Sequence, residues 1–198
     1  MPTGHEGVDD TIDGMIRGFV SAWDPVAQKE VWRIQHAGSW NGGMLSTHGN
    51  LIFQGNSSGR FVAYGADSGE ELWSVPAQTG IIAPPVTYEI DGEQYITVVA
   101  GWGGAFALAA GAAELYGLKP RGRILTYKLG GDLELPPVTE KPVPVPEPPP
   151  VEGADEQIAH GKFIYHKYCG VCHGAGVRSG GLLPDLRYML AGKHIVFE

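Results

Sequence analysis

The chain contains 198 residues, of which 43% are hydrophobic and 18% are charged, and its formal net charge is −8. This composition is typical of one or two folded globular domains. It argues against a nucleic-acid partner, because no cluster of Lys and Arg is available to neutralise phosphates. It also argues against a membrane span, because no apolar run approaches the roughly 18 residues that a spanning helix needs. The 30 glycines indicate many turns and therefore β structure.

An internal repeat occupies the N-terminal part of the chain. The segments AWDPVAQKEVW and AYGADSGEELW begin 41 residues apart, at Ala22 and Ala63, and end on Trp32 and Trp73. A period near 40 residues, with a strand, a tight turn and a second strand in each unit, is typical of propeller blades. We expect each closing indole to pack between adjacent blades.

Further strands are predicted around this repeat. Apolar and β-branched runs that follow or flank turn sequences lie at 51–54, 60–64, 86–90 and 94–100. The Asp-Gly-Glu turn at 91–93 between the last two runs predicts a β-hairpin. The histidines at 5, 36, 48, 160 and 166 show no spacing typical of metal ligands, and we expect them at the surface or in turns.

A proline-rich stretch divides the chain. The sequence LPPVTEKPVPVPEPPPVEG at 135–153 predicts a stiff, extended polyproline II conformation. We interpret it as a spacer between two modules, with a proline-rich ligand for an SH3-type domain as the alternative. The chain is thereby divided into a β-rich part at 1–135, a linker at 136–151 and a second module at 152–198.

The second module is predicted to begin with a helix. Between Asp155 and Tyr168, apolar side chains recur at loose helical spacing, which predicts a helix that leads into CGVCHG at 169–174. The apolar stripe by itself does not indicate a heme module, because an ordinary surface helix with one core-facing side would show the same pattern.

Both cysteines of the chain lie in a C-x-x-C-H motif. Such a cysteine pair can be a redox couple, half of a zinc site, a short-loop disulfide or a heme attachment site. A zinc site would lack its second cysteine pair, and a redox couple normally follows a strand rather than a helix. Only heme attachment also requires the histidine. Cys169 and Cys172 would form thioethers with the vinyl groups of heme c, and His173 would bind the iron.

Around this motif the sequence resembles the class I cytochrome c domain. In that family the proline of a P-x-L segment offers its carbonyl oxygen to the other nitrogen of the iron-binding histidine. Pro184 and Leu186 in LPDL match the segment, so the resemblance implies that Pro184 orients His173. A plain turn role for Pro184 is the alternative.

The second axial ligand of the iron is less clear from the sequence. Met189 is the one methionine after the motif, and we expect it to pack against apolar side chains, with iron ligation as its alternative role. His194 is a further candidate. Residues 152–198 are too few for the usual cytochrome c fold, so we expect an incomplete α-helical module.

The β-rich part resembles the pyrroloquinoline quinone (PQQ) dehydrogenases, whose eight-bladed propellers carry motifs of the form A-x-D-x-x-x-G-x-x-x-W. The two copies in this chain depart from the motif at Gly65, where aspartate is usual, and at Gln28, where glycine is usual. Residues 40–55, 76–106 and 121–131 look like the last blades of the quinohemoprotein alcohol dehydrogenases, in which a linker and a cytochrome c domain follow the propeller. We therefore expect a mostly β fold with about three blades of an eight-bladed propeller, followed by the incomplete heme module.

This resemblance implies a two-stage electron path. An alcohol is oxidised to an aldehyde at the quinone, and electrons then pass through heme c to an external acceptor such as a small redox protein. The resemblance assigns Trp40 and Asn41 to the PQQ site, with Trp102 nearby, since an indole can form a platform for a planar quinone and an amide can reach its oxygens. A packing role for Trp40 and a turn role for Asn41 are the alternatives.

No catalytic acid or base is assigned. In the family the aspartate base, the calcium ligands and a vicinal disulfide belong to earlier blades, and no segment here matches them, so we expect the chain alone to be inactive. The sequence MPTGHEGVDD lacks the features of a signal peptide, whereas c-type heme is attached outside the cytoplasm. We therefore expect a signal peptide upstream of Met1 and a periplasmic protein. The rival hypothesis is a non-catalytic electron-transfer cytochrome on a propeller scaffold.

Overall fold

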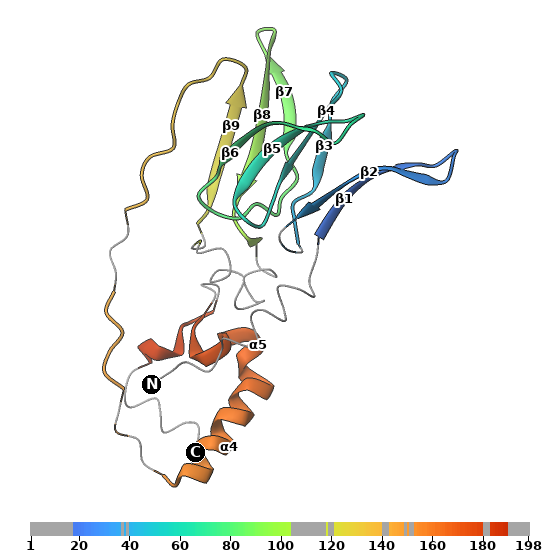
Figure 1. Ribbon diagram of the computed structural model, residues 1–198. Helices are drawn as coiled ribbons and strands as arrows, with labels where there is room; N and C mark the ends of the chain where they lie inside the picture. The colour runs from blue at the N-terminus through green and yellow to red at the C-terminus, as the bar shows by residue number, and fades with distance from the viewer. Residues whose placement is uncertain are drawn as a thin grey trace. The chain divides into compact units, whose positions relative to one another are not determined.

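The computed structural model describes residues 18–36, 38, 40–103, 118, 121–139, 143–148, 150, 153–179 and 183–189. The chain falls into two compact units, namely Met1–Trp102 with Arg121–Leu135, and Gly103–Pro120 with Pro136–Glu198 (Figure 1). Unit 1 consists of β-strands and unit 2 carries the helices, so the mostly β fold is confirmed. The division into parts at 1–135, 136–151 and 152–198 stays a prediction. Within the described residues, none of the helices combines the length and the hydropathy that a membrane span requires.

Three antiparallel sheets form the described part of unit 1 (Figure 1). The first is a hairpin of β1 (Gly18–Asp24) and β2 (Lys29–His36). The second is a meander of β3 (Met44–Ser46), β4 (Leu51–Gly55), β5 (Arg60–Gly65) and β6 (Glu71–Pro76). The third contains β7 (Val86–Ile90), β8 (Glu93–Ala100) and β9 (Arg123–Lys128). The strands predicted at 51–54, 60–64, 86–90 and 94–100 are therefore confirmed.

The sequence repeat is also a structural repeat. A register shift falls after Ala22 in the β1–β2 pair and after Ala63 in the β5–β6 pair. The turn residues Gln28 and Gly69 both have a positive φ, of 52° and 72°. Gln28 thus adopts at some conformational cost the left-handed geometry that the usual glycine of this motif adopts freely.

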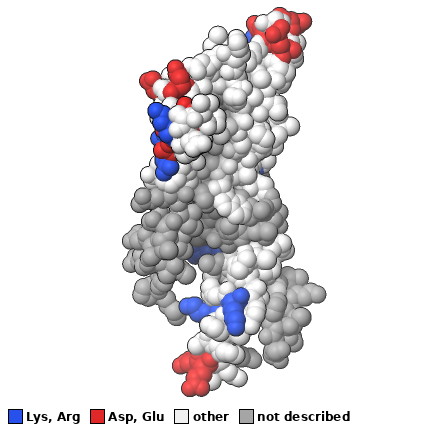
Figure 2. All heavy atoms as spheres, turned by 90° about the vertical axis from the view of Figure 1, so that its right-hand side faces the viewer, with Lys and Arg blue, Asp and Glu red and all other residues white. Residues whose placement is uncertain are grey.

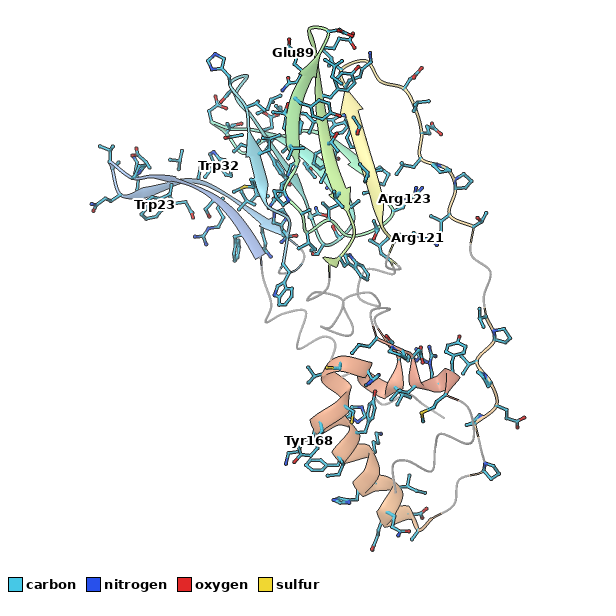
Figure 3. The ribbon with its side chains drawn as sticks, turned by 180° about the vertical axis from the view of Figure 1, so that it is seen from behind. Trp23, Trp32, Glu89, Arg121, Arg123 and Tyr168 are labelled. Atoms are coloured by element: carbon cyan, nitrogen blue, oxygen red, sulfur yellow. The ribbon has the colours of Figure 1, made fainter. Side chains whose placement is uncertain are left out.

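The closing tryptophan of each repeat contacts the next sheet. Trp32 on β2 (Figure 3) donates a hydrogen bond from Nε1 to the carbonyl oxygen of Ala66, 3.1 Å away in the β5–β6 turn. A Cβ on Gly69 would lie 2.8 Å from two atoms of the same indole, so this turn needs glycine for space as well as for its φ. Trp73 on β6 packs edge-on against Tyr127 of β9, with ring centroids 5.4 Å apart. The expected packing of these indoles between sheets is confirmed.

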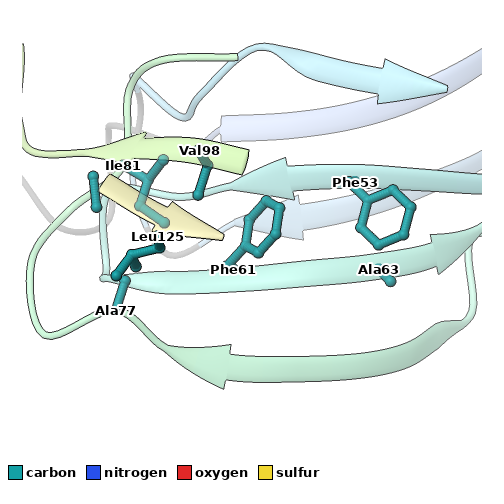
Figure 4. Packing of buried hydrophobic residues seen from close by; sticks show 8 residues of the cluster. Phe53, Phe61, Ala63, Ala77, Ile81, Val98 and Leu125 are labelled. Atoms are coloured by element: carbon teal, nitrogen blue, oxygen red, sulfur yellow. The ribbon is translucent and has the colours of Figure 1, made fainter. Parts of the chain in front are cut away.

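The hydrophobic core lies between the second and third sheets (Figure 4). Phe61 on β5 is fully buried at its centre. Its ring stacks on Tyr127 with centroids 5.3 Å apart and on Phe53 at 6.1 Å. Side chains from both sheets and from the connection between β6 and β7 complete this core, namely Ala63, Ala77, Ile81, Val98, Ala100 and Leu125.

The outer faces of unit 1 keep many apolar side chains at the surface. On β7, β8 and β9 these include Val86, Ile90, Val99 and Ile124, and on the β1–β2 hairpin they include Phe19, Trp23 and Val31. Acidic and basic side chains both occur on the face drawn in Figure 2. Charged side chains of unit 1 form ion pairs such as Arg33 with Glu30 and Lys128 with Glu93, but these pairs are solvent-exposed and add little to stability.

A buried polar chain links the first two sheets. His36 is only 7% exposed, although the sequence analysis expected it at the surface or in a turn, and that expectation is wrong. Gln54 donates from Nε2 to the carbonyl oxygen of Gly42 over 2.8 Å, so its Oε1 faces His36 Nε2 at 3.0 Å and accepts a hydrogen bond from it. Burial lowers the pKa of His36 below its ordinary value of 6.5, and the bond to Gln54 offsets this only in part.

Replacing Phe61 with alanine should destabilise unit 1 by about 3–5 kcal/mol, because the substitution leaves a cavity where two sheets meet. Urea unfolding followed by tryptophan fluorescence measures this loss. Val26→Ala is the control, since Val26 is 92% exposed and should change the free energy of unfolding by less than about 0.5 kcal/mol. Equal effects of the two substitutions would contradict the placement of the core.

His36 should make the stability of unit 1 pH-dependent. Because the folded-state pKa lies below the unfolded value of 6.5, the unfolded chain binds more protons between the two values. The contribution is therefore complete above about pH 6.5 and is lost as the pH falls toward the folded-state pKa. Urea unfolding at pH 7.5 and 5.5 should show a smaller pH effect in His36→Gln than in the wild type. A His36 ring that titrates at or above its ordinary pKa by NMR would refute this.

Candidate functional site

The C-x-x-C-H motif sits at the end of a continuous helical segment. Helix α4 (Asp155–Ile164) passes into the π-helix η1 (Tyr165–Cys169) and then into α5 (Gly170–His173) (Figure 1). At its start, Gln157 Oε1 accepts a hydrogen bond from the Ala154 N–H at 3.0 Å, and Asp155 and Glu156 place negative charge in the first turn. The predicted helix before the motif is therefore confirmed.

The two thiols are positioned for attachment of a large group. Cys169 ends η1 and is half-buried, whereas Cys172 lies in α5 and is exposed, and both are free. The two cysteines are three residues apart, on either side of the junction between η1 and α5. His173 follows as the last residue of α5 and is half-buried.

The structure brings His173 and Pro184 together. The Nδ1 atom of His173 lies 3.0 Å from the carbonyl oxygen of Pro184. A carbonyl can only accept, so Nδ1 carries the proton and the lone pair on Nε2 is left for a metal. Sequence reasoning placed these two residues in this relation, and the contact supports that assignment, which stays a prediction until heme binding is measured.

The segment that carries Pro184 is braced by an ion pair. Asp185 accepts from Arg187 Nε at 3.0 Å and from Arg187 Nη2 at 2.6 Å, and it also caps the short helix η3 (Leu186–Tyr188) by accepting from the Arg187 backbone N–H. These bonds hold the pKa of Asp185 below its ordinary value. Tyr188 donates from its hydroxyl to the carbonyl oxygen of Val143 at 2.9 Å, which fastens η3 to the proline-rich stretch.

The structure assigns no residue as the second axial ligand of the proposed heme iron. Met189 is half-buried and follows η3, where its backbone N–H donates to the Leu186 carbonyl oxygen at 3.1 Å. Nothing in the described contacts shows where its sulfur atom would bind. His194 lies outside the described residues. Both assignments therefore stay predictions.

The side chains around the motif suit a heme group. The thiols are available for thioether formation, and the imidazole is held in the tautomer that leaves Nε2 for iron. Exposed apolar side chains flank the thiols along the same helical segment, among them Phe163 and Val171. Within the described residues, no group of three or more His, Cys, Asp or Glu side chains is placed to hold a metal ion by itself. A heme, which brings four of its own nitrogens to the iron, needs no such group.

In unit 1, Asn41 acts as an anchor between two loops. Its Nδ2 donates to the Gly38 carbonyl oxygen at 2.9 Å, and its Oδ1 accepts from the backbone N–H of Ser57 at 3.1 Å. Ser57 is 1% exposed, so this bond satisfies a buried donor. Asn41 thus has a structural role as an anchor, whereas its predicted contact with PQQ and its alternative role in a turn both stay predictions.

Trp102 hydrogen-bonds to the same serine as Asn41. Its Nε1 donates to the Ser57 carbonyl oxygen at 3.3 Å, and the indole is 2% exposed. A Cβ on Gly80 would lie 1.5 Å from Nε1, so glycine is required beneath this ring. Trp102 is a buried packing residue in this chain, and its predicted proximity to PQQ is not tested by these contacts.

Trp40 is presented differently from Trp102. It is 50% exposed, and its backbone has φ = 63°, a conformation that is strained for a large side chain. Asn41 directly after it fixes the backbone through the bonds to Gly38 and Ser57. An exposed indole on a fixed backbone is suited to stack on a planar ligand.

Two arginines of unit 1, Arg121 and Arg123, make contacts that the sequence did not predict. Arg121 and Arg123 lie where the chain enters β9 (Figure 3). Arg123 Nη2 donates to Gln78 Oε1 at 2.6 Å, and the Arg121 backbone N–H donates to Thr79 Oγ1 at 3.4 Å. The doublet RGR at the start of a predicted strand was the available signal, but its partners lie more than 40 residues away in the sequence.

Comparison with known proteins identifies a family over part of unit 1. Residues 14–96 match the β-propeller domain of glucose, ethanol and alcohol dehydrogenases that use PQQ. The match covers the hairpin β1–β2, the second sheet and most of β7 and β8.

Whole-chain relatives extend the similarity across both units. The chain is 46% identical over 201 residues to the quinohemoprotein alcohol dehydrogenase ADH-IIG of Pseudomonas putida, which covers 100% of this chain and 27% of that protein. It is 44% identical to the 1-butanol dehydrogenase (cytochrome c) of Thauera butanivorans, with 88% of this chain and 25% of that protein covered.

Solved structures show the same relation. The structure of ADHIIG from Pseudomonas putida HK5 matches with a TM-score of 0.77 and 48% identity, covering 91% of this chain and 26% of that one. The quinohemoprotein alcohol dehydrogenase of Comamonas testosteroni matches with a TM-score of 0.67 and 42% identity, covering 89% and 25%. The chain thus spans about a quarter of the length of these proteins.

Asn41→Ala should lower the free energy of unfolding by about 1–3 kcal/mol, because the buried N–H of Ser57 loses the acceptor that Asn41 supplies. Urea unfolding measures this. Gln94→Ala removes an exposed amide that donates to Thr87 and should have an effect below about 0.5 kcal/mol. An Asn41→Ala variant as stable as the Gln94 control would show that Asn41 is not an anchor.

Proposed function

We propose that the chain, which is similar to the quinohemoprotein alcohol dehydrogenases over about a quarter of their length, supplies the last propeller blades and the start of the heme module of such an enzyme. In this proposal the enzyme oxidises alcohols to aldehydes at PQQ and passes the electrons through covalently bound heme c to an external acceptor. The partial eight-bladed propeller and the incomplete cytochrome c fold are parts of the same proposal.

The observation that carries the proposal is the contact between His173 and Pro184. A C-x-x-C-H sequence alone could occur by chance, but here the histidine also has its Nδ1 proton bonded to a carbonyl oxygen 3.0 Å away. Such a bond to the far nitrogen orients an imidazole ligand and makes it a stronger donor to a metal. The three residues of the motif and this partner together fit one iron-binding side of a heme.

The cysteines would attach the heme by addition. Each S–H of Cys169 and Cys172 adds across a vinyl C=C bond, with sulfur bonding to one carbon and hydrogen to the other, so no oxidant is consumed. The attached group would supply reversible one-electron exchange. The role of the chain is to hold this group by two covalent bonds and to keep Nε2 of His173 directed at the iron.

On the propeller side, the residues proposed to contact PQQ are Trp40 and Asn41, with Trp102 nearby. PQQ would supply the two-electron oxidation of the alcohol. The exposed indole of Trp40 supports a stacking role, whereas Asn41 and Trp102 converge on Ser57 and would steady the loops from which Trp40 projects. The aspartate base and the calcium ligands belong, in this proposal, to blades that this chain does not contain.

The proposal also covers the compartment, the substrate and the electron acceptor of the enzyme. Covalent heme attachment points to the periplasm, a small alcohol is the substrate, and a small redox protein is the acceptor. The name of the Thauera butanivorans relative supports both an alcohol substrate and a cytochrome c component.

Expression of the full chain in a bacterial periplasm with heme maturation machinery should give a red protein whose heme survives denaturing electrophoresis. Cys172→Ala should retain a single thioether, which shifts the absorption of the reduced pyridine adduct. Val171→Ala is the matched control, because Val171 is exposed and adjacent but has no proposed bond to heme. A colourless protein that binds zinc instead would contradict the proposed function.

A further inference from the structure

The loop directly after the heme motif has an unusual backbone. Gly174, Gly176 and Val177 have φ values of 87°, 58° and 61°. A β-branched residue such as Val177 is seldom found in the left-handed region, because its side chain crowds the backbone there. Such a conformation persists only where the surroundings hold it, and it is found most often at functional sites.

Two side chains of the π-helix η1 hold this loop. Tyr165 donates from its hydroxyl to the Gly174 carbonyl oxygen at 2.7 Å, and the backbone N–H of Val177 contacts the same hydroxyl. His166 Nε2 accepts from the Gly176 N–H at 3.4 Å, while its Nδ1 lies 2.8 Å from the Lys162 carbonyl oxygen. A carbonyl on one nitrogen and an amide N–H on the other define a neutral ring with its proton on Nδ1.

The held loop at 174–177 directly follows His173, and His173 also contacts Pro184 further along the chain. Gly174 follows His173 in the chain, and further on the Pro184 carbonyl oxygen accepts from His173 Nδ1. Between them, the Ser179 hydroxyl donates to the Leu183 carbonyl oxygen directly before Pro184. A shift of Gly174 would therefore change the angle at which the His173 ring is held.

We propose that Tyr165 and His166 are positioning residues which clamp the loop at 174–177 and thereby fix the orientation of the His173 ring toward the heme iron. This inference rests on the proposed heme attachment. The wide turn of the π-helix directs two consecutive aromatic side chains to this loop, and their rings pack edge-on with centroids 5.2 Å apart. π-helical turns are frequent at functional sites for this kind of local redirection.

The test uses the full chain, loaded with heme in the periplasm, as wild type, Tyr165→Phe and Tyr168→Phe. Tyr168 is the matched control, because it lies on the same π-helix and is 64% exposed. In Tyr165→Phe the Gly176 and Val177 amides should exchange with solvent about fivefold to tenfold faster, as expected for the loss of one hydrogen bond. The heme midpoint potential and the hyperfine-shifted NMR signals of the His173 ring should also shift, whereas Tyr168→Phe should match the wild type in all three.

A second pair of variants separates positioning from general stability. His166→Phe should shift the same potential and ring signals as Tyr165→Phe, and His160→Phe on α4 should not. If Tyr165→Phe and His166→Phe lower only the free energy of unfolding while the potential and the ring signals stay at wild-type values, the clamp is overturned. A wild-type chain without heme would instead refute the proposed function, so the two failures can be told apart.

Discussion

The contact of each closing tryptophan with the following sheet is the interaction on which unit 1 depends. Hydrogen-bonded ladders run within each of the three sheets, and beside the isolated bridge between Ile81 and Gly101 the sheets are held together by contacts between side chains and neighbouring turns. Trp32 reaches from β2 to the β5–β6 turn, and Trp73 reaches from β6 to Tyr127 on β9. Because both contacts come from the same position of the sequence repeat, the period of about 40 residues in the sequence sets the stacking of the sheets in space.

This way of joining sheets explains where glycine is required. Gly69 lies beneath the indole of Trp32, and Gly80 lies beneath that of Trp102, and a Cβ at either position would clash with the ring. The high glycine content predicts turns, which is correct for Gly69 but incomplete. At both positions glycine also provides the space into which a tryptophan from elsewhere in the unit fits.

Local patterns predicted most of the fold. Apolar and β-branched runs beside turn sequences predicted four strands, the Asp-Gly-Glu sequence predicted the β7–β8 hairpin, and helical spacing predicted the helical segment before the C-x-x-C-H motif. Features that depend on distant partners could not be predicted. His36 is buried because Gln54 supplies a partner 18 residues away, and Trp102 is buried because Ser57 and Gly80 come together around it. A single sequence shows the type of each residue but not which distant residues will surround it in the fold.

In the candidate heme site too, features set by local spacing could be predicted, whereas those set by contacts with other segments could not. Cys169, Cys172 and His173 are close in sequence and could be assigned from spacing alone, and Pro184 could be assigned only because a known family pairs it with such a histidine. The hydrogen bonds that Tyr165 and His166 share with the following loop could not be predicted, since neither residue belongs to a motif. Their position depends on a π-helical turn, which changes the direction of side chains in a way that a regular helical pattern does not predict.

The two units differ in what stabilises them. Unit 1 has a core of its own around Phe61, whereas α4, η1 and α5 contain no buried residue among those described. Helices of this length gain most of their stability from packing of an apolar face rather than from intrinsic propensity. Under the proposed heme attachment at Cys169 and Cys172, exposed apolar side chains of the same helical segment, such as Phe163 and Val171, would gain a large apolar group to pack against. In such a module, attachment of the proposed heme and stability of the fold are the same event, because a ligand that binds only the folded chain adds its binding free energy to folding.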